Sequence, residues 1–133
     1  MKQNLLLIIT SLLSILFMTL HLTGDTIRAS AGTPEAGGST LIAVPILVVW
    51  LYGTLMLAER GSGHIIMLVG ALLALLMPVA HVIGAGGIFR WQIARSGPSF
   101  LFVWTLHAIG VTGMFSLILS VRGLWNLRRG QPR

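Results

Sequence analysis

Four long apolar runs, separated by short polar segments, constrain this chain more than any other feature of its sequence. Each run is close to the roughly 20 residues that a helix needs to cross the hydrocarbon core of a bilayer. With 55% hydrophobic and only 9% charged residues, the 133-residue chain cannot hide its apolar surface in a soluble core. The sequence therefore predicts an all-α membrane protein with lipid as its main surroundings.

The apolar runs divide the chain into spans and connections. We place transmembrane helices at about residues 5–23, 40–58, 64–83 and 100–121 of a single membrane domain, 1–133. Residues 24–39 and 84–99 are richer in glycine and polar residues, so we predict loops there, and residues 122–133 form a basic tail. The short polar turn between the second and third runs is typical of antiparallel neighbours, which predicts an antiparallel four-transmembrane-helix bundle.

The distribution of basic residues predicts the orientation of this bundle. If both termini are cytoplasmic, six basic residues lie inside: Lys2, Arg60, Arg122, Arg128, Arg129 and Arg133. Three lie outside: Arg28, Arg90 and Arg95. The positive-inside rule favours this arrangement, and it explains the net charge of +6 without a nucleic-acid partner. We expect a multi-pass protein of a bacterial-type plasma (inner) membrane, with an interfacial segment at residues 90–95.

The first apolar run has a second interpretation, as a signal peptide. An early lysine precedes it, and Ala29-Ser30-Ala31 fits the small-residue cleavage pattern. The run is, however, longer than the about 7 to 15 residues of a typical signal-peptide core, which favours a first span. The sequence leaves both interpretations open, and cleavage would remove His21 from the mature protein.

Histidines are the main indication of chemistry. With both termini inside, His21 and His81 lie near the outer ends of the first and third spans, at matching depth. His107 lies about eight residues into the fourth span, roughly 12 Å deep at 1.5 Å per residue. His64 lies at the inner boundary, where we expect an exposed or interfacial side chain.

Two helical stripes predict that His21 and His81 point into the bundle, because small and polar residues on a span mark the face that packs on other helices. The first stripe contains Ser11, Ser14, Met18, His21 and Asp25, and the second contains Met67, Gly70, Ala74, Met77 and His81. On the fourth helix, His107 lies nearly opposite a face of Thr105, Thr112, Ser116 and Ser120. If that polar face is buried, His107 faces lipid or another subunit.

Several ligands would suit this set of side chains. Two imidazoles at one depth could ligate haem b, with His21 and His81 as the axial pair or His81 with His107 as the alternative. A bacteriochlorophyll would need only one imidazole. Met18 and Met77 beside these histidines would suit copper(I), although packing is the commoner role of methionine. A quinone head-group site could use His21 and Asp25 with Trp91 or Trp104. Hydrogen-bonded or interfacial histidines without any ligand are the structural alternative.

The absence of other reactive groups limits the function. The chain has no cysteine, and its three acidic residues fall outside the predicted spans, so thiolate chemistry and transport through a buried carboxylate are disfavoured. Catalysis without such groups is hard to build, which favours a non-enzymatic role. We predict a non-catalytic subunit or anchor beside other membrane subunits or copies of itself. The alternative is a haem b electron carrier, and the third option is a small transporter or channel.

Overall fold

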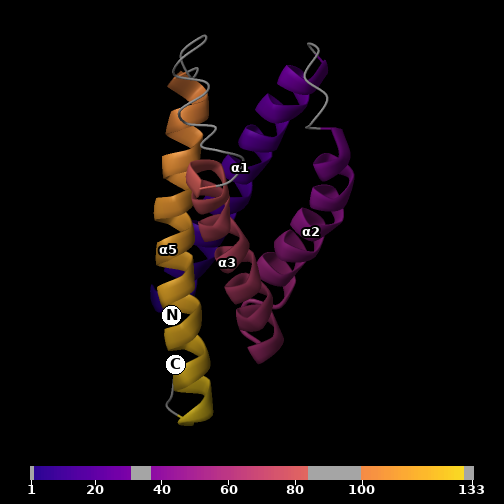
Figure 1. The fold of residues 1–133 in the computed structure, drawn as a ribbon. Helices are drawn as coiled ribbons and strands as arrows, with labels where there is room; N and C mark the ends of the chain where they lie inside the picture. The colour runs from indigo at the N-terminus through magenta and orange to yellow at the C-terminus, as the bar shows by residue number, and fades with distance from the viewer. Residues whose placement is uncertain (1, 31–36, 84–99, 131–133) are drawn as a thin grey trace.

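The computed structural model describes residues 2–30, 37–83 and 100–130, and their regular structure is entirely helical (Figure 1). The four helices are α1 (Lys2–Ser30), α2 (Gly37–Met56), α3 (Gly61–Ile83) and α5 (Phe100–Arg128). They alternate in direction, so the N- and C-terminal ends of the described chain lie toward the same end of the bundle. The predicted antiparallel arrangement of four helices is confirmed.

Contacts between helices show that α5 has a central place in the bundle. It packs along α1 on one side and α3 on the other, whereas α2 packs against α3 and α1 (Figure 1). Direct contact between α1 and α3 is the weakest of these interfaces. A group that links α1 to α3 would therefore strengthen the weakest of the contacts between helices in the bundle.

Three of the four helices are long and apolar enough to cross a membrane: Gln3–Ile27, Gly61–His81 and Phe100–Arg128. In α2, the described stretch Ile42–Met56 is also apolar. The predicted second span, residues 40–58, extends beyond this helix, which ends at Met56.

Three predicted boundaries need correction. Residues 37–39, predicted as the end of the first loop, belong to α2, which begins at Gly37. Residues 24–30, predicted as part of a loop, continue α1, because after Gly24 this stretch contains no residue that breaks a helix. Residues 122–128, predicted as a tail, continue α5. Residues 31–36 and 84–99 of the predicted loops, including the interfacial segment at 90–95, lie outside the described residues. A helix need not end where its hydrocarbon span ends, which is why hydropathy misplaced these boundaries.

The two predicted stripes do face the interior of the bundle. On α1, Ser11 and Ser14 are fully buried and His21 is 2% exposed, and on α3 Met67 and Ala74 are fully buried. The structure also identifies the buried face of α5, which carries Thr105, Ser116 and Ser120 among other small residues. These faces form the core, and the larger apolar residues on the opposite faces remain exposed, as expected for side chains in contact with lipid.

A buried tryptophan connects α2 to both of its neighbours. The Nε1–H of Trp50 donates a hydrogen bond of 2.8 Å to Ser11 Oγ on α1, and Ser11 Oγ lies 2.8 Å from Thr54 Oγ1. The indole also lies directly against Gly70 of α3, where a Cβ atom would overlap the ring. Trp50 is thus held by a polar contact on one side and by close backbone packing on the other.

Replacing Trp50 with phenylalanine should destabilise the protein by about 1–3 kcal/mol, because the hydrogen bond to Ser11 is lost and part of the indole volume is left empty. Unfolding of the purified protein in detergent, followed by circular dichroism, measures the change. Trp125→Phe is the matched control, since Trp125 is 55% exposed and its loss should have little effect. Equal effects of the two substitutions would contradict a special role for the Trp50 contact.

Candidate functional site

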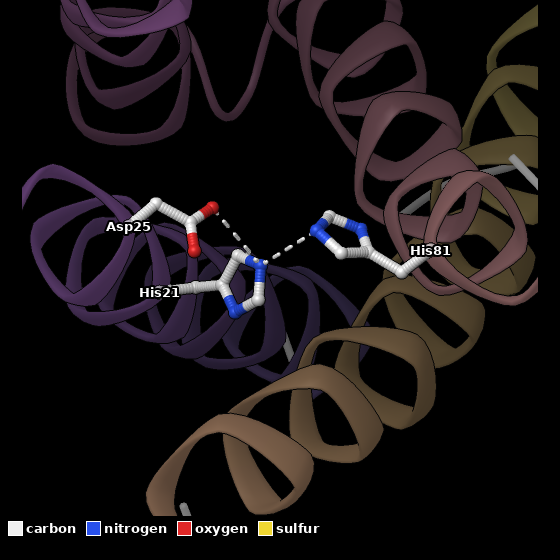
Figure 2. A group of neighbouring side chains, drawn as sticks. All are labelled: His21, Asp25 and His81. Atoms are coloured by element: carbon white, nitrogen blue, oxygen red, sulfur yellow. Dashed lines mark hydrogen bonds and ion pairs between the residues drawn. The ribbon is translucent and has the colours of Figure 1, made fainter. Parts of the chain in front are cut away.

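Two histidines and an aspartate lie together at the end of the bundle where α1 and α3 finish and α5 begins (Figure 2). His21 and Asp25 are one helical turn apart on α1, and His81 is near the end of α3. The opposite directions of successive helices bring residues far apart in the sequence to this end. The structure therefore makes neighbours of His21 and His81, which the sequence placed at the same depth.

The reactive atoms of the three side chains converge on one small volume. His21 Nε2 lies 3.5 Å from His81 Nε2 and 3.6 Å from Asp25 Oδ2. One ligand atom from each of the three residues lies within 4.8 Å of the others. His21 is buried, whereas His81 and Asp25 are partly exposed. The group thus lies at the edge of the packed interior.

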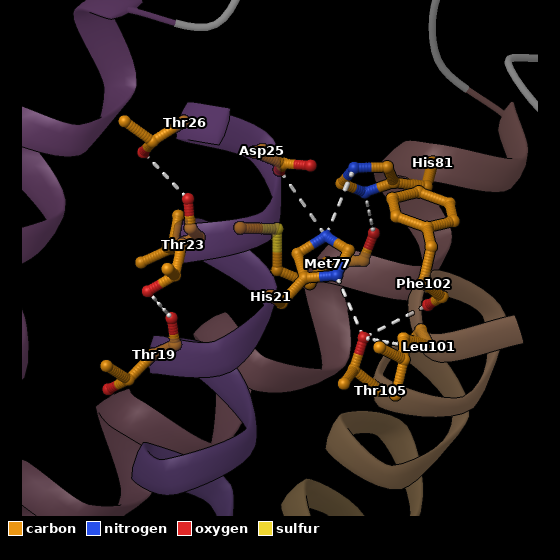
Figure 3. Close-up of polar contacts among 11 residues, drawn as sticks. Thr19, His21, Thr23, Asp25, Thr26, Met77, His81, Leu101, Phe102 and Thr105 are labelled. Carbon is orange, nitrogen blue, oxygen red and sulfur yellow. Dashed lines mark hydrogen bonds and ion pairs between the residues drawn. The ribbon is translucent and has the colours of Figure 1, made fainter. Parts of the chain in front are cut away.

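A backbone hydrogen bond indicates which nitrogen of His81 carries the proton. His81 Nδ1 lies 2.8 Å from the carbonyl oxygen of Met77, one turn earlier on α3 (Figure 3). A carbonyl oxygen can only accept, so Nδ1–H is the donor. In the neutral imidazole, Nε2 then has a lone pair and no proton. This lone pair is directed toward His21.

A similar argument applies to His21, through a threonine on α5. Thr105 Oγ1 donates to the carbonyl oxygen of Leu101 at 2.8 Å, so its hydroxyl proton is already used (Figure 3). The same oxygen lies 3.4 Å from His21 Nδ1 and can accept from it. His21 Nδ1–H is therefore the donor, and Nε2 is the nitrogen of the neutral ring that carries the lone pair.

Both hydrogen bonds have the same consequence for the centre of the site. The two Nε2 atoms and the Asp25 carboxylate are all electron-pair donors, and His81 Nε2 and Asp25 Oδ2 lie 3.5 Å and 3.6 Å from His21 Nε2. Neutral imidazoles in these tautomers cannot hydrogen-bond directly to each other. A positive charge between them, either a proton or a metal ion, would satisfy all three groups at once.

The distances agree with the size of a first-row transition metal ion. With bonds of about 2.0–2.1 Å, two ligands of a tetrahedral metal ion lie about 3.3–3.4 Å apart. The separations of 3.5 Å and 3.6 Å around His21 Nε2 are close to this value. Metal-binding histidines commonly donate their second N–H to a carbonyl oxygen or another acceptor, as both rings do here. Small side-chain movements would complete the coordination.

The surroundings of the pair do not fit the haem interpretation. Phe102 of α5 packs against both imidazoles, with ring centroids 5.0 Å from His21 and 5.6 Å from His81 (Figure 3). The Asp25 carboxylate lies beside His21 Nε2. A haem plane between the two Nε2 atoms would extend on all sides of the iron and would overlap these neighbours. The described residues thus suit a single ion better than a macrocycle.

His107 is not part of this group. It lies on the exposed side of α5, and its Nδ1–H donates to the carbonyl oxygen of Val103 at 2.8 Å. Because the Thr/Ser face of α5 is the buried one, His107 points toward lipid or toward another subunit. His81 with His107 is therefore not supported as an axial pair.

The remaining predicted residues have other surroundings. Met18 is buried, and together with Met77 it lines an apolar cavity of about 240 Å³ between α1, α2 and α3, which is a packing environment. Trp104 of the quinone hypothesis packs edge-on against Phe17, and Trp91 lies outside the described residues. His64 was expected to be exposed or interfacial, and exposure is wrong: its side chain is 1% exposed because its ring lies against Gly123 of α5.

Sequence reasoning did not identify Thr105 and Phe102 as residues of the site. Both are on the first turns of α5, and their roles depend on the rotation of that helix about its axis. The spacing of threonine and serine along α5 was the feature of the sequence that could have identified Thr105, because it placed this residue on the face opposite His107. Comparison of the chain with protein-family models, with curated proteins and with solved structures found no match.

Proposed function

We propose that this protein is a small integral membrane protein that binds a divalent transition metal ion through His21, His81 and Asp25. One observation carries the proposal: the ligand atoms of His21, His81 and Asp25 converge on one small volume, with His21 Nε2 3.5 Å from His81 Nε2 and 3.6 Å from Asp25 Oδ2. The carboxylate beside them supplies negative charge. Nitrogen and oxygen ligands of this kind suit Zn²⁺ and its first-row neighbours.

The position of the site suggests what the ion does. Its ligands come from α1 and α3, which have little direct contact with each other, so a bound ion would join them at this end of the bundle. Three protein ligands leave at least one coordination position for water or for a ligand from outside the chain. This arrangement suits an ion that exchanges with its surroundings. A protein with this site would respond to the metal by tightening one end of its bundle.

The wider role predicted from the sequence is compatible with this proposal. A non-catalytic subunit or anchor in a larger membrane complex could hold a metal ion, and the many exposed apolar side chains would suit neighbouring spans as well as lipid. Haem b binding and electron transfer have less support because Phe102 and Asp25 surround the pair. The transporter or channel hypothesis stays a prediction without a specific observation in its favour.

Zinc titration of the purified full-length protein tests the proposal. We expect one Zn²⁺ per chain by isothermal titration calorimetry in detergent micelles at neutral pH. His81→Ala should weaken binding by at least about tenfold, the lower range for loss of groups that support a metal site. His107→Ala is the matched control, because His107 has a similar backbone hydrogen bond but lies outside the site. Its zinc affinity should equal that of the unchanged protein.

Two outcomes would contradict metal binding. One is the absence of a zinc-binding event in a protein that N-terminal sequencing shows to retain His21. The other is equal loss of affinity in the His81 and His107 variants, which would indicate adventitious binding to surface histidines. In the first case, the positive charge between the three groups would be a proton shared with Asp25 or His81, and the cluster would serve only to hold α1 against α3.

A further inference from the structure

The exposed face of α5 carries a regular stripe that the metal site does not use. The stripe consists of Trp104, His107, Val111, Met114, Ile118, Val121 and Trp125, spaced alternately by three and four residues. All of these residues are exposed, since α5 packs on α1 and α3 through its opposite face. We call this set the α5 seam. Alternate spacing by three and four is the pattern of positions a and d in a two-helix coiled coil.

The seam has the dimensions of a membrane-spanning interface. From Trp104 to Trp125 it extends about 31 Å at 1.5 Å per residue, close to the about 30 Å of the hydrocarbon core. An apolar face would be satisfied by lipid alone, because lipid chains are as apolar as valine or isoleucine. The polar atoms on the seam therefore decide whether it needs a protein partner.

His107 has a polar atom that lipid cannot satisfy. Its Nδ1–H donates to the carbonyl oxygen of Val103, so Nε2 of the neutral ring is an acceptor. Within the described residues, this Nε2 receives no hydrogen bond. His107 lies seven residues after the start of α5 at Phe100, roughly 10 Å along the helix, where water is scarce. A polar group at such a depth commonly faces a partner and not lipid.

Trp104 supplies the complementary group one turn earlier. It is 46% exposed, and its ring contacts Phe17 edge-on at 5.1 Å. The indole N–H can only donate, and in the part of the chain that the structure describes it has no acceptor. The seam thus carries one unused donor and one unused acceptor, three residues apart. His107 cannot satisfy a second His107 directly, since both Nε2 atoms are acceptors.

We propose that two copies of this chain pair through the α5 seam as a symmetric parallel dimer. In such a pair, the Trp104 N–H of each copy donates to His107 Nε2 of the other copy, and the symmetry axis repeats the bond. A symmetric interface requires that one patch complement itself, and the seam meets this condition because it contains both donor and acceptor. The polar pair also fixes the register of two otherwise apolar helices. The proposal is independent of metal binding.

Cysteine cross-linking tests the interface directly, because the natural chain contains no cysteine. Val111→Cys places a thiol on the seam, and Val48→Cys places one on α2. Both valines have similar exposure, 57% and 60%, so they are a matched pair. In lipid vesicles containing EDTA and oxidised with diamide, the Val111→Cys protein should form a disulfide-linked dimer, and the Val48→Cys protein should form no disulfide cross-link. EDTA keeps the result separate from any metal effect.

Substitution of the polar pair tests its role within the dimer. In fluorescence energy transfer measurements in vesicles, His107→Leu and Trp104→Phe should each weaken dimerisation by about ten- to several-hundredfold, because each substitution removes both symmetry-related hydrogen bonds and one interhelical hydrogen bond in a bilayer is worth about three- to thirtyfold. The double variant should dimerise as strongly as the single variant that dimerises less, because each single substitution already removes the same hydrogen bonds. Met114→Leu keeps the seam apolar and should change little. Unchanged thermal unfolding of the monomer provides the check on folding.

Three results would overturn the proposal. The first is a monomer at every ratio of protein to lipid. The second is equal cross-linking through positions 111 and 48, which would show random encounters. The third is full dimerisation by the His107→Leu protein, which would show that the polar pair does not select the partner.

Discussion

Replacing His21 with alanine should abolish the rise in unfolding temperature that Zn²⁺ produces in the intact protein. An ion that binds only the folded state stabilises it by about 2.7 kcal/mol when its free concentration is 100 times its dissociation constant. For a chain of this size, that energy corresponds to a rise of roughly 5 to 10 °C. His21 is the central ligand, within 3.6 Å of both other groups, so its loss removes the site.

The measurement compares each variant with and without zinc, because His21→Ala also removes a buried side chain and lowers the baseline stability. His64→Ala is the matched control. His64 is similarly buried, and its Nδ1–H donates to the backbone carbonyl oxygen of Arg60, but it lies at the opposite end of the bundle. It should lower the baseline and keep the zinc-dependent rise. Loss of that rise in both variants would show that zinc stabilises through general packing and not through the proposed site.

The sequence predicted that His21 and His81 belong to one site. Both histidines lie on stripes spaced by three and four residues that also carry small or polar side chains, and such stripes face other helices in a membrane. Matching depth followed from counting residues in adjacent spans. The structure places the two Nε2 atoms 3.5 Å apart. Periodicity and depth together were therefore sufficient to pair two residues on different helices.

Asp25 required a correct helix boundary. The sequence placed Asp25 on the stripe of His21, but Gly24 and the polar residues that follow it also predicted a loop from residue 24, and in a loop the position of a carboxylate is not fixed. Because α1 continues to Ser30, Asp25 lies one turn beyond His21 on the same face. Hydropathy marks the end of the hydrocarbon core, not the end of a helix, so this error is inherent in the method.

Thr105 and Phe102 could not be placed from the sequence, because their positions depend on the rotation of α5. This helix is apolar nearly all round, and its amphipathic signal is too weak to define which side faces the bundle. The two candidate faces, the Thr/Ser face and the face of His107, were recognised, but the choice between them needed the packing of α5 on α1 and α3. The rotation of α5 places Thr105 and Phe102 beside the proposed metal site and places His107 on the α5 seam.

The affinity for zinc should fall steeply in acid, with a slope that counts the imidazoles in the site. A histidine must lose its Nε2 proton to bind a metal. In acid, below the range in which both imidazoles are neutral, each imidazole in the site therefore lowers the affinity for zinc by up to about tenfold for every pH unit of further acidification. A plot of the logarithm of affinity against pH should therefore approach a slope of two in acid and level off toward alkaline pH. Titration calorimetry between about pH 5 and pH 8 would measure it.

Variants of the two outer ligands make this slope diagnostic. His81→Ala should reduce the limiting slope to one, because only His21 then exchanges a proton for the metal. Asp25→Asn should lower the affinity at every pH and keep a slope near two, since both imidazoles remain in the site. A limiting slope of one in the unchanged protein would mean that a single imidazole binds zinc. The 3.5 Å approach of His21 to His81 would then reflect a shared proton, and the metal would have to lie elsewhere.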